Sequence, residues 1–203
     1  DAGLAKNIEQ LLYHFDRYIL NRETGHLGLF FDEDWQSRSD TISFGHDIEA
    51  AWLLCEAAEA IDDKILLQKM QDNALLLAES VAEALDADGG LWYECEPQKQ
   101  MLVKEKHWWP QAEAMVGFFY AWQISLFTEY REHAIRSWEF IQRHIKDHKH
   151  GEWFWGVDEH YNVMPGQDKA GFWKCPYHNS RACMEIMQRL RWQPSPSTLY
   201  TRH

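Results

Sequence analysis

Residues 89–113, with the sequence GGLWYECEPQKQMLVKEKHWWPQAE, contain the pattern that decides the fold. A glycine turn at Gly89 and Gly90 precedes aromatic and aliphatic residues at strand-like spacing, and these end at the acidic Glu94. Farther along, His107 precedes an apolar pattern with helical periodicity. The stretch therefore predicts the first arm of a short β-hairpin, followed by a helix that carries a histidine near its start.

The same pattern occurs once before this stretch and once after it. The earlier copy, GHLGLFFD at Gly25–Asp32, leads to His46, and the later copy, GEWFWGVD at Gly151–Asp158, leads to His178. Each copy predicts the first arm of a β-hairpin stacked over helix ends. The three histidines are roughly 60 to 70 residues apart, which indicates an internal structural repeat.

Helical periodicity predicts six helices, at about 4–20, 48–61, 64–85, 112–127, 133–145 and 180–190. Tight turns at 61–63 and 128–129 join them into hairpins, and each turn offers a polar residue to cap the next helix. Repeated hairpins bury their faces against one another in an open solenoid or a closed ring. In a ring, the inner helices present the same end to one central mouth, where the three histidines would converge.

We therefore predict an all-α fold: three helical hairpins that form half of an (α/α)6 toroid, with short β-hairpins in the long connections. The repeats run at about 1–61, 62–127 and 128–203, and the whole chain is the C-terminal half of a toroidal domain. The chain does not begin with Met, from which we expect further sequence upstream.

Composition narrows the class of protein. Lys plus Arg number 20 and Asp plus Glu number 32, so the formal net charge of −12 disfavours nucleic acid and anionic lipid as partners. No apolar run approaches the roughly 18 residues of a membrane span. The four cysteines fit neither a zinc spacing nor a disulfide framework, which favours a reducing, cytoplasmic compartment. The 11 Trp residues serve core packing or the walls of a sugar-binding cleft.

Two histidines at equivalent repeat positions are candidates for acid/base chemistry. His46 is followed three residues later by Glu49, on the same helix face, where a carboxylate can orient the imidazole or hold a substrate hydroxyl. His178 follows Pro176, which marks a helix entry. The alternative interpretation is that each histidine only helps to begin its helix.

The segment around His107 adds candidate binding residues. Of the adjacent Trp108 and Trp109, at most one can face the core, so the other can stack on a sugar ring. Glu113, one turn into the helix, can bind paired hydroxyls, and Trp173 can form another wall of the same cleft. Plain packing is the competing interpretation for each Trp.

Other motifs predict no chemistry. The histidines of HIKDHKH at 144–150 lie near a polar helix end, where the macrodipole favours them, and no convergent thiolates or carboxylates accompany them. The chain has no phosphate-binding glycine loop, no Gly-x-Ser-x-Gly elbow and no His-Glu-x-x-His motif. We therefore expect neither a metal nor a cofactor.

Three motifs, FGHDIEAAWLLCEAAE, HWWPQAEAMVGFF and GFWKCPYHNSRACMEIM, resemble those of the N-acylglucosamine 2-epimerase superfamily. The resemblance extends from about residue 10 to residue 192, with the motifs in order. Asp47 after His46, and His178 within Pro-Tyr-His-Asn-Ser, are similar to the cellobiose 2-epimerase branch.

The resemblance implies an (α/α)6 toroid that inverts C2 of a reducing-end sugar by abstracting and returning a proton. His46 and His178 match the catalytic histidines of the family, and His107 matches a motif position without an assigned role. The matching cleft positions are Glu49, Trp109, Glu113 and Trp173. An arginine, a tyrosine and a further histidine that the family takes from its first half are missing here, so we expect the chain to need that half for activity.

Several alternatives remain open at this point. A glycoside hydrolase would use a carboxylate pair such as Glu49 and Glu113. An aldose–ketose isomerase acting on mannose, or an N-acylglucosamine 2-epimerase, would share the histidines, whereas a non-catalytic α-solenoid binding module would need none of them. The expected partners are a small sugar, such as cellobiose or a related β-1,4-disaccharide, and either a second copy of the chain or the missing N-terminal half.

Overall fold

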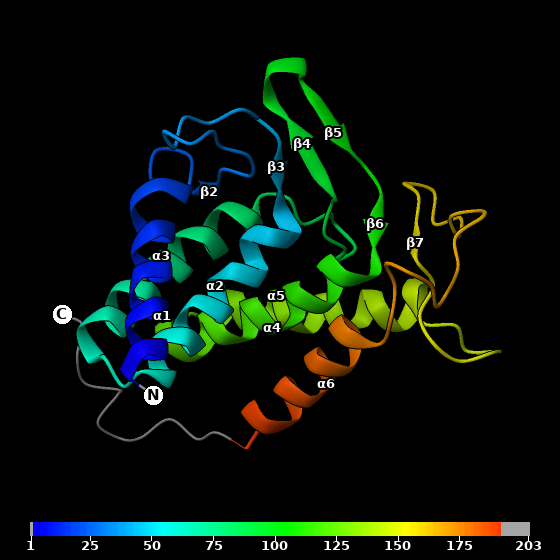
Figure 1. The fold of residues 1–203 in the computed structure, drawn as a ribbon. Helices are drawn as coiled ribbons and strands as arrows, with labels where there is room; N and C mark the ends of the chain where they lie inside the picture. Colours follow the sequence, from blue (N-terminus) through cyan, green and yellow to red (C-terminus); the bar gives the residue numbers. More distant parts are fainter. Residues whose placement is uncertain (1, 192–203) are drawn as a thin grey trace.

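The computed structural model describes residues 2–191 and is mainly helical (Figure 1). Its α-helices are α1 (Ala2–His14), α2 (Phe44–Ala60), α3 (Lys64–Ala82), α4 (Trp108–Ser125), α5 (Thr128–Phe140) and α6 (Tyr177–Arg189). Short π-helical segments, η1 (Phe15–Ile19) and η3 (Ile141–Ile145), extend α1 and α5, and a 3-10 turn, η2, spans Pro97–Lys99. Every predicted helix is present, and most begin a few residues earlier than the periodicity indicated.

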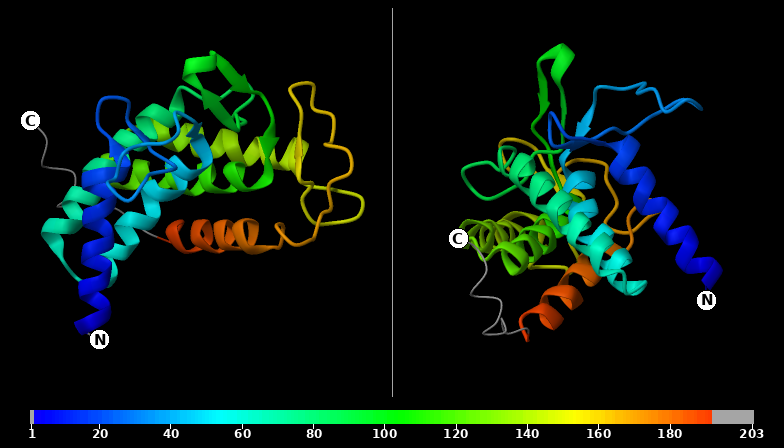
Figure 2. Two further views of the ribbon diagram at one scale, coloured as in Figure 1. Left: turned by 45° about the horizontal axis from the view of Figure 1, so that its top comes forward. Right: turned by 90° about the vertical axis from the view of Figure 1, so that its left-hand side faces the viewer.

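The helices form an inner row and an outer row. The inner helices are α2, α4 and α6; α2 contacts α4, and α4 contacts α6. The outer helices pack on them, α1 and α3 on α2, and α5 on α4. In the left view of Figure 2, α6 runs below α4, and the outer helix α1 stands at the left. This is the predicted arrangement of three helical hairpins in half of an (α/α)6 toroid.

The central helix α4 is apolar on all sides because it lies among α2, α3, α5 and α6. Gly117 lets α2 approach α4 closely: a Cβ atom there would lie 2.6 Å from the carbonyl oxygen of Ile48. The core, which includes Trp52, Phe118 and Phe140, is continuous across all three hairpins. A rigid central helix thereby sets the spacing of the inner helix ends.

Short antiparallel strands link the long connections. Strand β1 (Leu20–Asn21) pairs with β2 (His26–Leu27), and a three-stranded sheet has the order β3 (Ile42–Ser43), β4 (Glu94–Glu96), β5 (Met101–Val103). Strand β6 (Lys106–His107) pairs with β7 (Gly156–Val157). The first connection is thus tied to the second, and the second to the third, above the helix ends (Figure 1).

Each long connection begins with a glycine turn, of five residues in the first and third connections and of four residues in the second. The main-chain carbonyl oxygen of a polar residue accepts a hydrogen bond from the main-chain N–H of a glycine. The φ angle of that glycine lies in the left-handed region, between +72° and +90°. The three pairs are Asn21 with Gly25, Asp86 with Gly89, and Asp147 with Gly151. Glycine is required here because a Cβ atom is strained at such φ values.

Two local predictions were wrong. The Gly25–Asp32 stretch provides the second arm of its hairpin rather than the first, because the tight turn before Gly25 pairs His26 and Leu27 with the preceding residues. Asp63 caps α3 as expected, accepting from two main-chain N–H groups, but α5 begins at Thr128, with Phe127 at its cap position.

Within residues 2–191, no helix is long and apolar enough to cross a membrane. The predicted first and third repeats extend to residues 1 and 192–203, which lie outside the described residues.

Candidate active site

A hollow of about 420 Å³ lies at the N-terminal ends of the inner helices. All three hairpins contribute to its lining, which consists of His46, Glu49, Tyr93, His107, Trp108, Trp109, Trp155, Trp173 and His178. The lining follows from the repeat, because each long connection delivers its histidine to the first turn of an inner helix or to the residue before it. The structure therefore brings together six of the seven site residues that the sequence singled out.

His46 lies in the first turn of α2 and is exposed to the hollow. Its Nδ1 is 2.8 Å from the hydroxyl oxygen of the buried Ser43, and its ring centroid is 4.8 Å from that of Trp109. Ser43, and not His46, occupies the cap position of the helix. The hydrogen bond orients the imidazole, and Nε2 remains as the nitrogen available for chemistry.

His178 approaches the same indole from α6, with its ring centroid 5.6 Å from that of Trp109. Its Nδ1 lies 2.7 Å from Oε1 of Glu113 and 3.9 Å from Oε1 of Glu49. A carboxylate bonded to one imidazole nitrogen fixes the tautomer and stabilises the protonated ring. His178 is thus a candidate base whose Nε2 serves the hollow.

The loop before α6 is anchored by a buried cation. Lys174 is fully buried, and its Nζ donates to Oε1 of Glu152 at 3.1 Å and to the carbonyl oxygen of Lys169 at 2.8 Å. Asn179, next to His178, donates to the same Glu152 oxygen at 2.7 Å. These bonds fix the entry of α6 and thereby the position of His178.

Glu113 differs from its prediction. Its side chain is 0% exposed and does not line the hollow, so it is not placed to bind paired sugar hydroxyls. Instead, its carboxylate accepts hydrogen bonds from Trp52 Nε1 at 3.0 Å and from Arg181 Nη2 at 2.6 Å, and it holds His178. It supports the histidine from behind.

His107 belongs to the wall of the hollow. It is nearly buried, stacks on Tyr93 with ring centroids 3.9 Å apart, and places Nε2 2.7 Å from Oε2 of Glu105. Burial lowers its pKa, and the Glu105 carboxylate opposes that effect. A neutral imidazole that stacks on a tyrosine is suited to forming the wall of the hollow and less suited to carrying a proton.

The tryptophans divide as the sequence suggested. Trp108 is buried and packs on Trp155, with centroids 4.5 Å apart, whereas Trp109 is half-buried between the two histidines. Trp173 is 79% exposed and lies at the rim of the hollow. Trp109 and Trp173 can therefore offer ring faces to a sugar.

Four side chains at the site were missed by the sequence reasoning: Trp52, Tyr93, Trp155 and Arg181. Trp52 follows Glu49 by three residues and Arg181 follows His178 by three, so each shares a helix face with a selected residue. That spacing was the available signal. Arg181 Nη2 donates to Oε1 of Glu49 and Oε1 of Glu113, both at 2.6 Å.

The donor atoms of Glu49, Glu113 and His178 lie within 4.8 Å of one another, a geometry that can hold a metal ion. The guanidinium of Arg181 already bonds both carboxylates, so the positive charge at this point comes from the protein. These residues therefore do not form a free metal site.

The histidines of the 144–150 segment do not converge: His144 stacks on Tyr161, and His148 bonds the carbonyl oxygen of Gln142.

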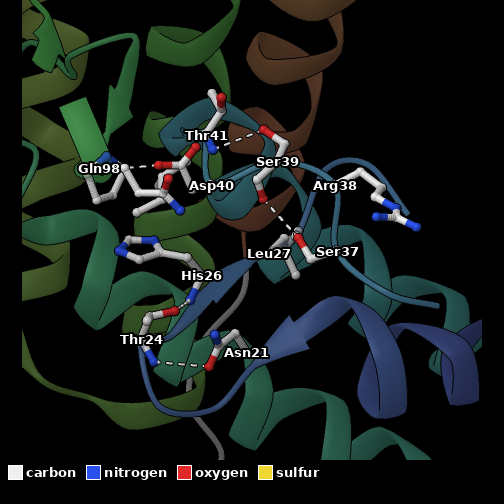
Figure 3. Close-up of a pocket in the computed structure, with 13 residues that line it drawn as sticks. Asn21, Thr24, His26, Leu27, Ser37, Arg38, Ser39, Asp40, Thr41 and Gln98 are labelled. Carbon is white, nitrogen blue, oxygen red and sulfur yellow. Dashed lines mark hydrogen bonds between the residues drawn. The ribbon is translucent and has the colours of Figure 1, made fainter. Parts of the chain in front are cut away.

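A second hollow, of about 660 Å³, lies beside β2 and the 37–42 loop (Figure 3). Its lining has no Trp, Tyr or Phe, and several of its polar groups bond one another, as Gln98 does with Asp40 and Thr41 with Ser39. His26 extends into it and binds the buried Asp47 through Nδ1 at 2.8 Å. This hollow offers no stacking face for a sugar.

Comparisons with known proteins agree with this picture. The sequence profile of the N-acylglucosamine 2-epimerase (GlcNAc 2-epimerase) family matches residues 3–182. The cellobiose 2-epimerase of Bacteroides fragilis is 42% identical over 92% of this chain and 48% of its own length, and that of Dictyoglomus turgidum is 40% identical over 94% and 48%.

Solved structures give the same result. A sugar epimerase from a ruminal bacterium superposes with a TM-score of 0.89 at 34% identity, over 93% of this chain and 48% of its own. The cellobiose 2-epimerase of Spirochaeta thermophila superposes with a TM-score of 0.86 at 39% identity, over 94% and 47%. The chain spans about half the length of the curated relatives it matches.

Proposed function

The chain belongs to the N-acylglucosamine 2-epimerase family, and on this basis we propose that it carries the acid/base histidines of a sugar 2-epimerase. The substrate is cellobiose or a related β-1,4-disaccharide, whose reducing-end glucose is inverted at C2. The observation that carries the proposal is the contact of His46 and His178 with the same Trp109 ring at one hollow.

The reaction needs two proton carriers. The C2 proton lies alpha to the carbonyl of the open-chain sugar, and one imidazole accepts it while the bonding electrons form an enediolate. The other imidazolium returns a proton to the opposite face of C2, and the carbonyl forms again with inverted configuration. Imidazole suits this work because its unperturbed pKa, about 6.5, lies near neutrality, and a positioned acid or base contributes on the order of 10²- to 10⁴-fold.

The surroundings of the histidines support this division of work. Glu113 can stabilise the imidazolium that forms at His178, and Ser43 orients His46. Trp109 and Trp173 offer faces for the sugar rings, and Glu49, at the edge of the hollow, offers a carboxylate to a hydroxyl. His107 and Tyr93 give that wall its shape.

We also propose that a second half-toroid completes the enzyme, as an N-terminal half or a second copy of the chain. Large apolar side chains are exposed on the helices at both ends of the half-ring: Leu4, Leu11 and Tyr13 on α1, and Met184 and Met187 on α6. The relatives are about twice as long, which supports this partner. The donor that stabilises the enediolate oxygen would come from that half.

The alternatives fit less well. As a hydrolase pair, Glu49 and Glu113 would need a glycosidic bond between them, but both bond the same nitrogen of Arg181, and Glu113 is fully buried. An interaction module would not need histidines and tryptophans gathered around a hollow. All four cysteines are unpaired, in keeping with the proposal of a cytoplasmic enzyme.

The test is proton NMR of cellobiose incubated with the enzyme in heavy water. We expect deuterium at C2 of the reducing-end ring and the appearance of the 2-epimer. Neither H46A nor H178A should form the 2-epimer, and only one of the two variants should retain C2 exchange in cellobiose, because each histidine serves one face of C2. H148A is the matched control, because His148 lies outside the hollow and bonds a main-chain carbonyl. Release of glucose would indicate a hydrolase, a ketose product would indicate an isomerase, and C2 exchange that survives in H178A with full epimerisation would refute the proposal.

A further inference from the structure

Arg181 joins the two carboxylates that face His178. Its Nη2 donates to Oε1 of Glu49 and to Oε1 of Glu113, both at 2.6 Å. These acceptors come from α2 and α4, so one guanidinium connects all three inner helices. Its side chain is only 15% exposed and does not line the hollow, so it is not placed to touch the sugar.

Aromatic rings complete the setting of this arginine. Its guanidinium carbon lies 4.9 Å from the ring centroid of Trp52 and 4.4 Å from that of Tyr177, and its Nη1 bonds the Tyr177 hydroxyl at 2.6 Å. Trp52 in turn donates to Glu113. Burial would by itself lower the pKa of Arg181, but Glu113 and Glu49 raise it, so the side chain stays charged.

Charge determines what this arrangement does to the histidine. The groups facing His178 are Glu113 on α4, Glu49 on α2, Arg181 on its own helix, and the uncharged Trp109 and Tyr177. With Arg181 in place, two carboxylates and one guanidinium leave a single net negative charge. Without Arg181, the imidazole faces two negative charges, which favour its protonated form.

We propose that Arg181 is a positioning residue of the epimerase, which holds Glu49 and Glu113 in place and keeps His178 available as the neutral base. This inference rests on the proposed function and assigns a role to a side chain that does not contact the substrate. The effect passes through Glu113, because that carboxylate bonds both Arg181 and His178 at the same oxygen, Oε1.

The experiment compares R181Q with the unmodified enzyme in two measurements, the pH profile of kcat and the NMR titration of the His178 Cε1 proton. A charge removed at this range moves a titration by on the order of one pH unit. We therefore expect two quantities to move to higher pH by about that amount. One is the limb of the kcat profile that reports His178, and the other is the midpoint of the NMR titration of His178. The KM should change less than kcat, because Arg181 lies outside the hollow.

Two further variants separate positioning from mere support of the fold. R181K keeps the charge, so the midpoint should stay near that of the unmodified enzyme even if kcat falls. R189Q is the matched control: Arg189 lies on the same helix, bonds Glu56 at 2.6 Å, stands over the Tyr120 ring at 4.6 Å and is 14% exposed. It should cost stability without moving the His178 midpoint.

The outcomes are distinguishable from failure of the proposed function. If the unmodified enzyme exchanges no C2 proton, the epimerase proposal fails, and the NMR titration still tests the charge argument. If the enzyme exchanges the proton but R181Q leaves both midpoint and limb unmoved, the role of Arg181 is overturned and the function stands. Should R181Q not fold, R181Q/E49Q is compared with E49Q alone: loss of Arg181 takes the net charge that faces His178 from zero to −1, so the midpoint should rise by about one pH unit, and equal midpoints in the two variants would overturn the role.

Discussion

The replacement of Glu113 by Gln tests how the protein prepares His178. Gln keeps the shape of the side chain but has one acceptor oxygen, which can serve either Trp52 Nε1, at the position of Oε2, or Arg181 Nη2, at the position of Oε1. What it removes is the negative charge 2.7 Å from Nδ1 of His178. The amide no longer stabilises the imidazolium, and its N–H₂ group can force the tautomer whose Nε2 is already protonated.

The expected magnitude follows from that contact. A hydrogen bond to a charged group contributes about 1.5–3 kcal/mol, which corresponds to roughly 10- to 100-fold in rate. Loss of the correct tautomer adds to this, and the corresponding change in a serine protease triad costs about 10⁴-fold in kcat. We therefore expect E113Q to lower kcat by about 10²- to 10⁴-fold, with a smaller change in KM.

The assay is the rate of C2 deuterium incorporation into cellobiose, measured with circular dichroism of the variant to confirm its fold. E105Q is the matched control, because Glu105 and His107 form a second carboxylate–imidazole contact of 2.7 Å in the wall of the hollow. E105Q should lower the rate of C2 exchange by less than about tenfold, because His107 takes no part in the proposed proton transfer. An E113Q enzyme that exchanges C2 within about threefold of the unmodified rate would contradict the reasoning.

Two further predictions concern the fold that holds the site. Gly117→Ala should lower the free energy of unfolding by about 1–3 kcal/mol, because its Cβ would meet the Ile48 carbonyl, and thermal unfolding measures this. Lys106→Met should destabilise the protein at pH 7, because fully buried Lys106 bonds Asp86 and Asp88. Burial by itself raises the pKa of Asp88, but Lys106 lowers it below the ordinary value, so this stabilisation is present above about pH 4 and is lost as the pH falls further. Urea unfolding at pH 7 and pH 3 should show a smaller difference between Lys106→Met and the unmodified chain at pH 3, and an equal difference at both would contradict the linkage.

Much of the fold could be predicted from the sequence because its signals are local. Helical periodicity gave six helices, and the glycine turns gave three equivalent connections, each leading to His46, His107 or His178. Asp63 could be identified as a cap because its carboxylate reaches N–H groups only two and three residues away.

The remaining features depend on contacts between distant segments. Pairing of β3 with β4 and of β6 with β7 joins strands of two or three residues from different connections, and such short strands leave no periodic signal. The burial of Glu113 depends on how α6 lies against α4, and its partner Arg181 is 68 positions away. Sequence reasoning could place residues at the same end of the inner helices, but it could not identify the buried pairs that form between helices, such as Glu113 and Arg181.

The two-base mechanism is tested most directly by C2 proton exchange in H46A and H178A, measured separately on cellobiose and on its 2-epimer in heavy water. Each histidine serves one face of C2, so each variant should retain exchange of one epimer alone, the two variants with opposite preference, and neither should interconvert the epimers. If both variants exchange the same epimer, or if one still interconverts the two sugars, His46 and His178 do not act from opposite faces and the account is wrong.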